Sequence, residues 1–290
     1  MPLTLVPHSL CVEPPKLVLP TNACDAHLHI LDARFAPAIE GAPTPANMTW
    51  SDYQLLQQHL GCSRAVIVQA KHYGFDNACL LDAIARSNGQ ARGIAVVAPD
   101  ISDTELEHLD KGGIRGLRFS LWNSANAVAS WETLAPLTAR IAEFGWHIQL
   151  HAAADQLIAH ERLIDRLPTP LVIDHMGRLP PQRGLRHPAA QLLRRWLDEG
   201  QTWIKLSGAY LNSDSGAPDY VPTLTTAQQL VTWAPERLFW GSDWPHVTEQ
   251  HKPDDAHLVN LLSLWAGEHW QKILVDNPAK FYGFAEVEER

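Results

Sequence analysis

The segment Asp25-Ala26-His27-Leu28-His29 places two histidines two residues apart inside an apolar stretch near the start of the chain. On a β-strand, residues at this spacing project from the same face. Histidine often serves as a metal ligand, an acid or a base near neutral pH. The pair therefore indicates a metal site or a site that stabilises an anion, as hydrolysis requires. Alone, the motif is equally consistent with a half-buried strand whose histidines are only hydrogen-bonded.

Further polar side chains stand within, at or just beyond the ends of other apolar runs. They are Gln69, Lys71, His72 and Tyr73; Arg115, Arg118 and Trp122; His151; Asp174, His175 and Arg178; Lys205, Ser207 and Tyr210; and Asp243, Trp244 and His246. A single residue of this kind could serve a purely structural role. Four separate runs that each end in His or Asp are hard to reconcile with packing alone, because an ionised carboxylate there needs a partner or a metal.

Eight short apolar runs carry these residues, and none shows clean polar alternation. The runs are Ala23–Ile30, Ala65–Ala70, Gly93–Ala98, Ile114–Phe119, Trp146–His151, Leu171–Asp174, Trp203–Leu206 and Leu238–Gly241. Strands that are apolar on both faces are typical of parallel sheets covered by helices. Helical patterns with ordinary start and stop residues lie between them, at Ser51–Leu60 (with Ser51 as the N-cap), Asp76–Ser87, Ser130–Phe144, Asp155–Leu167 and Pro188–Glu199. The alternation predicts an α/β fold, a (βα)8 TIM barrel.

The connections differ in length. Turns from a helix to the next strand are short, whereas the loops 32–50, 177–187, 207–222 and 244–254, which follow strands, are long and polar or proline-rich. This is typical of a barrel whose site lies at the carboxyl ends of its strands. An open doubly wound sheet is disfavoured because no GxGxxG turn follows the first strand. We expect a proline-rich extended N-terminal arm over residues 1–20 and a single barrel domain over 21–290.

Composition limits the partners. The 290-residue chain has a net charge of −9 and shows no basic stripe, which argues against nucleic-acid binding. No apolar run approaches the ~20 residues that cross a bilayer, so we expect no membrane partner. The four cysteines have no CxxC spacing or disulfide pattern, and the first residues lack the basic start and apolar core of a signal peptide. Both observations favour a cytoplasmic location.

Several of these segments resemble the amidohydrolase superfamily, and within it the branch of lactonases that act on 2-pyrone-4,6-dicarboxylate, muconolactones and sugar-acid lactones. The most specific matches are Val172-Ile173-Asp174-His175-Met176-Gly177-Arg178 and Trp240-Gly241-Ser242-Asp243-Trp244-Pro245-His246. Further matches, in barrel order, cover most of the chain and end at the segment 277–283, which resembles the branch's terminal helix. The resemblance implies a hydrolase with the barrel fold.

The resemblance also implies roles for residues. Asp243 would be the general base that takes a proton from the attacking water. His27, His29 and His175 would polarise the scissile carbonyl and stabilise the oxyanion. Arg118 and Arg178 would hold a substrate carboxylate. Further candidates for substrate contact are Lys71, His72, Tyr73, Trp122, Tyr210, Trp244 and His246, of which Trp122 and Trp244 suit packing equally well.

The chain departs from the branch in its binding residues. The segments 121–126 and 207–212 lack the arginines that hold a second carboxylate, and Lys71 stands where a small hydroxyl residue is expected. His151 stands where a tyrosine is expected. The expected partner is therefore a small carboxylated lactone, and a muconate-derived or sugar-acid lactone is as acceptable as a pyrone diacid. For the assembly, a homodimer is the expectation to be tested.

His151 leaves the cofactor open. His27, His29, His151 and Asp243 match the superfamily pattern for one divalent metal, with Zn²⁺ best suited to imidazole and carboxylate ligands. Against a metal, the branch that the chain resembles works without one. A metal-dependent hydrolase of another C–O or C–N bond is the alternative function. An aromatic-acid decarboxylase is disfavoured because Asp25 stands where that branch has glutamate, and a non-catalytic binding protein is disfavoured by the complete His/Asp set.

Overall fold

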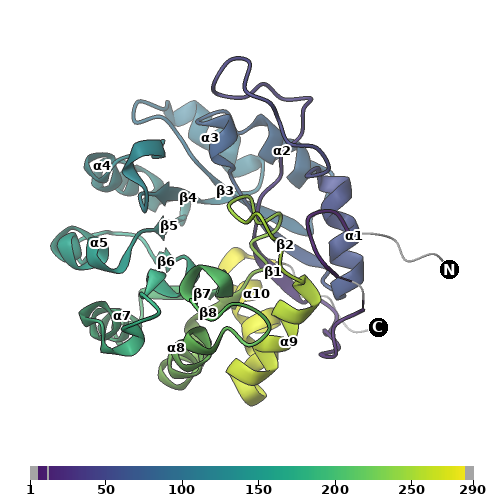
Figure 1. The fold of residues 1–290 in the computed structure, drawn as a ribbon. Coiled ribbons are helices and arrows are strands. Elements are labelled where there is room, and N and C mark those ends of the chain that lie inside the picture. The colour runs from purple at the N-terminus through teal and green to yellow at the C-terminus, as the bar shows by residue number, and fades with distance from the viewer. Residues whose placement is uncertain (1–5, 12, 285–290) are drawn as a thin grey trace.

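The computed structural model describes residues 6–11 and 13–284, and within them eight strands form one parallel sheet in sequence order (Figure 1). The strands are β1 (Cys24–Leu28), β2 (Arg64–Val68), β3 (Ala91–Ala95), β4 (Ile114–Ser120), β5 (His147–His151), β6 (Leu171–Ile173), β7 (Thr202–Leu206) and β8 (Leu238–Trp240). Each corresponds to one predicted run. The predicted α/β TIM barrel is therefore confirmed.

The barrel closes between β1 and the residues that follow β8. Leu28 and Trp244 form a parallel bridge. The amide of His29 donates to the carbonyl of Trp244 at 2.8 Å, and the amide of Asp243 donates to the carbonyl of His27 at 2.8 Å. The first histidine pair and the last aspartate are thus joined through the backbone, although they lie near opposite ends of the chain.

Helices surround the barrel (Figure 1). They are α1 (Trp50–Leu60), α2 (Ala78–Ala85), α3 (Asp103–Lys111), α4 (Trp131–Ile141), α5 (Ala154–Ala159), α6 (Glu161–Ile164), α7 (Pro188–Asp198), α8 (Val221–Trp233), α9 (Asp255–Ala266) and α10 (Asn277–Tyr282). All five predicted helices occur, but the fourth is divided into α5 and α6 at His160. Thr49, rather than Ser51, caps α1 in a reciprocal capping box with Asp52.

The barrel interior has an apolar lower layer and a polar upper layer. The lower layer consists of Cys24, Ala26, Val66, Val68, Ile94, Val172 and Phe239, and it packs against Tyr282 of α10 and Phe284. Above it, Arg118, Gln149, Asp174 and Lys205 are all buried. Because barrel interiors are usually filled by branched apolar side chains, this polar layer marks the end of the barrel that carries the site.

Residues 6–11 and 13–20 contain no helix or strand and lie against the barrel. Trp244 donates its indole N–H to the carbonyl of Pro7 at 2.8 Å, and Leu10 donates to the carbonyl of Pro253 at 3.0 Å. The division into an arm over 1–20 and a domain over 21–290 stays a prediction, and residues 1–5, 12 and 285–290 lie outside the described part. In the described residues, no helix has the length and apolarity needed to cross a bilayer.

Candidate active site

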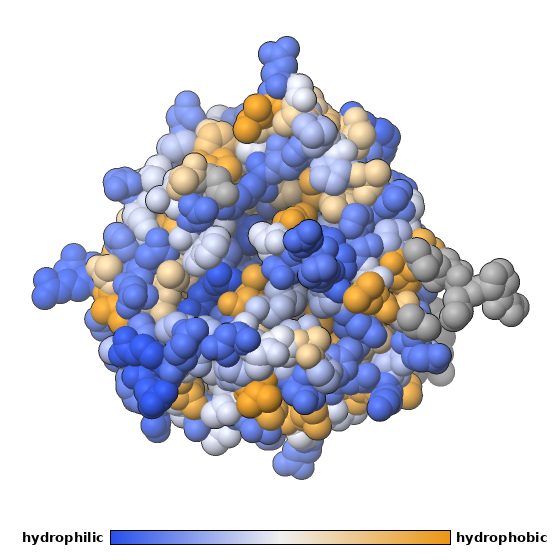
Figure 2. Space-filling model, in the orientation of Figure 1, coloured by the Kyte–Doolittle hydropathy of each residue, from blue (hydrophilic) through white to orange (hydrophobic). Residues whose placement is uncertain are grey.

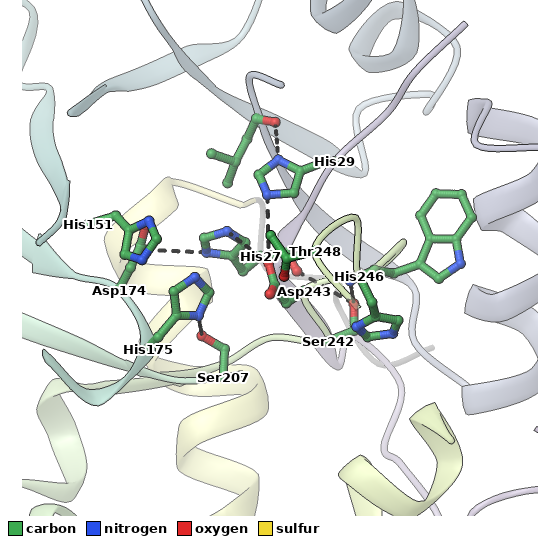
Figure 3. A network of polar contacts seen from close by, with 12 residues as sticks. His27, His29, His151, Asp174, His175, Ser207, Ser242, Asp243, His246 and Thr248 are labelled. Carbon is green, nitrogen blue, oxygen red and sulfur yellow. Dashed lines mark hydrogen bonds and ion pairs between the residues drawn. The ribbon is translucent and has the colours of Figure 1, made fainter. Parts of the chain in front are cut away.

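Both histidines of β1 and its continuation face Asp243 (Figure 3). Nε2 of His27 lies 3.5 Å from Oδ1 of Asp243, and Nε2 of His29 lies 3.6 Å from the same oxygen. Nδ1 of His29 lies 2.9 Å from the carbonyl oxygen of Val68, which can only accept, so this nitrogen carries a proton. Burial lowers the pKa of His27 well below its ordinary value, so His27 is neutral.

Asp243 follows β8 in a left-handed backbone conformation, with a φ of 64°. Its other oxygen, Oδ2, accepts a hydrogen bond of 2.7 Å from the hydroxyl of Tyr210. Burial opposes ionisation of Asp243, but His175 and the two β1 histidines outweigh it and hold the pKa of this carboxyl well below its ordinary value. Asp243 is therefore a carboxylate at neutral pH, with its side chain 12% exposed toward the site.

His175 and His151 complete the ring of imidazoles (Figure 3). Nδ1 of His175 lies 2.9 Å from the hydroxyl of Ser207, and Nδ1 of His151 lies 3.2 Å from the hydroxyl of Ser120. The His175 ring is 4.8 Å from the His27 ring and 5.0 Å from the His151 ring. Burial lowers the pKa of His175 and lowers that of His151 well below its ordinary value. These are neutral imidazoles with Nε2 left for a ligand.

Beneath the histidines lies a buried ionic network of Asp174 and Lys205, which the sequence analysis named as strand-end residues without predicting that they pair. Asp174 follows β6, and its Oδ1 lies 3.3 Å from Nδ1 of His27, while its Oδ2 accepts from the amide of Gln149 at 3.2 Å. Lys205 of β7 donates to Oε1 of Gln149 at 2.7 Å and lies 3.9 Å from Asp174. Burial would raise the pKa of Asp174, but His27 and Lys205 hold it well below its ordinary value. A lysine inside the apolar run Trp203–Leu206 was the available signal.

Asp25 supports the site from the side. Its carboxylate accepts from the amide and hydroxyl of Ser242 at 2.9 and 2.6 Å, from the hydroxyl of Tyr53 at 3.2 Å and from the amide of His27 at 3.2 Å. Ser242 directly precedes Asp243, so Asp25 links β1 to the turn that carries the carboxylate. Burial raises the pKa of Asp25 to about 6.

Three of the predicted substrate contacts are cations near the histidines. Arg118 is buried, and its Nε lies 3.6 Å from Oδ2 of Asp174. Lys71 lines a small cavity with Arg118, Gln69 and Ser120, and burial followed by the charge of Arg118 lowers its pKa to about 8. The guanidinium of Arg178 lies 4.5 Å from the ring centre of Trp122, across the loops that follow β4 and β6.

Trp122 stands at the rim of this region. Its side chain is 43% exposed, and its ring lies parallel to that of His151 at 6.0 Å. Figure 2, in the orientation of Figure 1, shows a face that is mostly hydrophilic with scattered hydrophobic residues. An exposed tryptophan over a histidine and an arginine is suited to a planar ligand.

Four other predicted contacts have their polar atoms engaged by protein groups, and one of them, His246, reaches Asp243 through the hydroxyl of Tyr210. The hydroxyl of Tyr73 bonds to the backbone of Asp32, and Nε2 of His72 lies 2.9 Å from the hydroxyl of Thr44. Trp244 is fully buried and bonds to Pro7. His246 is also buried, with Nδ1 2.9 Å from the hydroxyl of Tyr210 and Nε2 3.1 Å from both oxygens of Asp255. Tyr73, His72 and Trp244 thus hold the surrounding loops, and His246 joins Asp255 to Tyr210.

The residues present fit one divalent metal ion. Ligand atoms of His27, His175 and Asp243 lie within 4.8 Å of one another. In the described part of the chain, Nε2 of His27 is a buried atom without a hydrogen-bond partner, because its contact with Asp243 is not aligned as a hydrogen bond. His29 and His151 of the predicted set lie outside this group. A metal held here would polarise a carbonyl and lower the pKa of a bound water.

Comparison with known proteins places this geometry in a family. The model of the family described as "Amidohydrolase" matches residues 24–284. The chain is 36% identical over 290 residues to 2-pyrone-4,6-dicarboxylate hydrolase of Comamonas testosteroni, covering 94% of each chain. It is also 36% identical over 279 residues to 4-sulfomuconolactone hydrolase of Rhizobium radiobacter, covering 93% of each.

A solved structure agrees. The crystal structure of a probable 2-pyrone-4,6-dicarboxylic acid hydrolase from Acinetobacter baumannii, with citric acid bound, matches with a TM-score of 0.73 at 26% identity, and covers 91% of this chain and 100% of the other. The family match and the two relatives each extend over nearly the whole barrel. The chain therefore belongs to the amidohydrolase family and is a hydrolase of its lactone-hydrolysing group.

Proposed function

We propose that this hydrolase opens a carboxylated lactone by direct attack of water, with Asp243 as the general base. The observation that carries the proposal is the position of Asp243. Its Oδ1 lies 3.5 and 3.6 Å from Nε2 of His27 and His29, and its Oδ2 is held by Tyr210. A fixed carboxylate beside neutral imidazoles can take a proton from a water molecule while the imidazoles meet the carbonyl.

The reaction needs one proton to be taken and later returned. As the water oxygen attacks the lactone carbonyl carbon, Asp243 accepts its proton, and negative charge develops on the carbonyl oxygen. His27 and His175 donate to that oxygen from Nε2, while Nε2 of His29 lies 3.6 Å from Oδ1 of Asp243. The ring C–O bond then breaks, and the proton held by Asp243 passes to the departing alkoxide. The products are an alcohol or enol and a carboxylic acid, which releases its proton to the solvent at neutral pH.

The positive charges of Arg118, Arg178 and Lys71 favour a substrate that carries a carboxylate. Lys71 and Arg118 line one cavity, Arg178 lies over the ring of Trp122, and a guanidinium pairs well with a carboxylate. The relatives support this class, since one is named for a dicarboxylate and another for a sulfonated lactone. Citric acid in the similar Acinetobacter baumannii structure is likewise a carboxylate ligand.

The test is hydrolysis of a panel of lactones by the wild type and by Asp243→Asn. The panel contains 2-pyrone-4,6-dicarboxylate, muconolactone, 4-sulfomuconolactone and neutral aldonolactones. We expect at least one anionic lactone to be opened, and we expect Asp243→Asn to lower kcat by about 10²-fold or more, as loss of a general base does. Wild-type rates in Asp243→Asn, or an inactive wild type on every lactone, would contradict the proposal.

Two further variants control this experiment. Asp198→Asn changes a carboxylate that pairs with Arg194 on the outside of α7, and it should keep the wild-type rate. Arg178→Met should raise KM for carboxylated lactones and leave KM for neutral aldonolactones unchanged. The opposite preference would assign the site to a neutral sugar lactone.

The cell compartment and the assembly stay predictions. All four cysteines are buried and none forms a disulfide, which supports a reducing compartment such as the cytoplasm. Small-molecule lactones remain the proposed partners. Light scattering of the purified protein will decide whether it is a homodimer.

A further inference from the structure

Nδ1 of His27 has two neighbours that require opposite proton positions. Nζ of Lys205 lies 3.3 Å from this nitrogen, and Oδ1 of Asp174 also lies 3.3 Å from it. A lysine nitrogen that donates needs a lone pair on Nδ1, which places the single proton of neutral His27 on Nε2. A carboxylate that accepts needs the proton on Nδ1 instead. The two hydrogen bonds therefore exclude each other.

The geometry favours the lysine. The contact between Lys205 and His27 has the alignment of a hydrogen bond, whereas the contact between Asp174 and His27 does not. Among the residues that the structure describes, Oδ1 of Asp174 has no hydrogen-bond partner. Lys205 is fully buried and is held in place by Oε1 of Gln149 at 2.7 Å. Gln149 is itself fixed, since its amide donates to Oδ2 of Asp174 at 3.2 Å.

We propose that Lys205 is a positioning residue that fixes His27 in the tautomer with its proton on Nε2. This nitrogen lies at the site, 3.5 Å from Oδ1 of Asp243 and not aligned with it. Its N–H is thus available to a substrate carbonyl oxygen. An amine and an ammonium both carry N–H groups, so Lys205 can donate to Nδ1 in either state.

The inference also concerns a metal. A ring nitrogen that carries a proton cannot ligate a cation, so Lys205 opposes the use of His27 Nε2 as a ligand. Asp174 would support the opposite tautomer, as carboxylates do behind histidine ligands in metal sites. Lys205 thus favours the tautomer in which Nε2 of His27 donates a hydrogen bond to the substrate. Asp174 favours the tautomer in which Nε2 can ligate a metal. The inference rests on the proposed function, in which His27 donates to the lactone carbonyl.

Neutron diffraction of the deuterium-exchanged wild type tests the tautomer directly. We expect nuclear density for deuterium on Nε2 of His27 and none on Nδ1. Density on Nδ1 facing Asp174 would overturn the proposal. This measurement needs no substrate, so it separates a failure of this inference from a failure of the proposed lactone hydrolysis.

Two variants test whether Lys205 is the cause. In ¹⁵N-histidine NMR spectra, with His27 assigned from the His27→Gln variant, Lys205→Met should move the proton to Nδ1. We expect kcat to fall at least about tenfold with little change in KM, since one donor at the oxyanion is lost. We also expect the protein to bind more Zn²⁺ by metal analysis. Lys205→Gln, which keeps an N–H donor, should retain the wild-type tautomer.

Lys71→Met is the matched control, because it removes a different lysine, one that lines the cavity beside Arg118. It should leave the His27 proton on Nε2. An unchanged His27 spectrum in folded Lys205→Met would show that Lys205 does not set the tautomer. If that variant does not fold, the neutron result and Lys205→Gln still decide, since a proton on Nδ1 in either one contradicts the proposal.

Discussion

The hydroxyl of Tyr210 joins Asp243 to His246: its oxygen lies 2.7 Å from Oδ2 of Asp243 and 2.9 Å from Nδ1 of His246. A phenol has one proton and can donate to only one of them. Burial, and then the charge of Asp243, raises the pKa of Tyr210 well above its ordinary value, so the hydroxyl stays protonated. Donation to the carboxylate stabilises the charged form of Asp243.

Tyr210→Phe should therefore raise the pKa of Asp243. The base is active only when ionised, so the acid limb of kcat/KM should move to higher pH, by roughly one unit for the loss of one charge-assisted hydrogen bond. The measurement is the pH–rate profile on the best lactone. Tyr73→Phe is the control, because its hydroxyl bonds to the backbone of Asp32 instead. An acid limb that does not move would contradict the assigned donation.

Lys71 should make substrate binding sensitive to alkaline pH. Its pKa is lowered to about 8 by burial and by Arg118, so the cation is present below that pH and is lost above it. KM for an anionic lactone should then rise above about pH 8, while KM for a neutral lactone stays level. Lys71→Arg should remove this dependence, since a guanidinium remains charged. Equal alkaline limbs for both substrates would contradict a role for Lys71 in anion binding.

Removal of metal should leave lactone hydrolysis intact. If His27 carries its proton on Nε2, it polarises the carbonyl directly and no cation is needed. Protein purified with a chelator and shown by metal analysis to hold less than stoichiometric metal should keep its full kcat. Added Zn²⁺ should compete with the substrate through His175 and Asp243. Loss of activity on chelation, with recovery on addition of Zn²⁺, would contradict metal-independent hydrolysis.

Asp25→Asn should destabilise the fold as well as the site. Four groups donate to this carboxylate: the amide and hydroxyl of Ser242, the hydroxyl of Tyr53 and the amide of His27. The side-chain NH₂ of an asparagine would face at least one of these donors and could not accept its hydrogen bond. We expect a loss of about 2 kcal/mol in the free energy of unfolding, the cost of an unsatisfied buried group. Urea unfolding at pH 7 measures it, with Asp198→Asn as the surface control.

Asp25 also predicts how stability depends on pH. Its pKa is about 6 in the folded chain and about 4 when unfolded, so the folded state binds more protons between these values. The stability that this group contributes is complete below about pH 4 and is lost as pH rises to about 6, by about 3 kcal/mol. The difference in unfolding free energy between the wild type and Asp25→Asn should therefore grow smaller toward neutral pH, and a difference that stays constant from pH 4 to 7 would contradict the raised pKa.

The strands could be predicted from sequence because a parallel barrel needs apolar side chains on both faces, as in Val66-Ile67-Val68. Their ends were less certain. The first was predicted to reach Ile30 but ends at Leu28, because the next amide, that of His29, donates to the carbonyl of Trp244. Helices α3, α8 and α9 fell in stretches whose patterns were not individually interpreted.

Side chains on loops were the harder part of the site. Asp243 and His27 were grouped correctly as neighbours by barrel order alone, since both end adjacent strands. Tyr73 and Trp244 also follow strands, yet backbone partners in distant loops hold them, and no local pattern reveals such a partner. Lys205 was named among the strand-end residues but received no role, because a single lysine in an apolar run has no visible partner until Gln149 and Asp174 are folded against it.

Because the barrel closes between β1 and the residues after β8, the activity depends on the folding of the whole chain. Asp25 and Ser242 are 217 residues apart in sequence and are hydrogen-bonded in space, so the base and the first histidines meet only when the last strand docks on the first. A nascent chain that has not yet released β8 from the ribosome has no such site. During synthesis in a cell-free system, lactone hydrolysis should accordingly begin only after the final strand has emerged. The onset of hydrolysis would therefore mark the time at which the barrel closes.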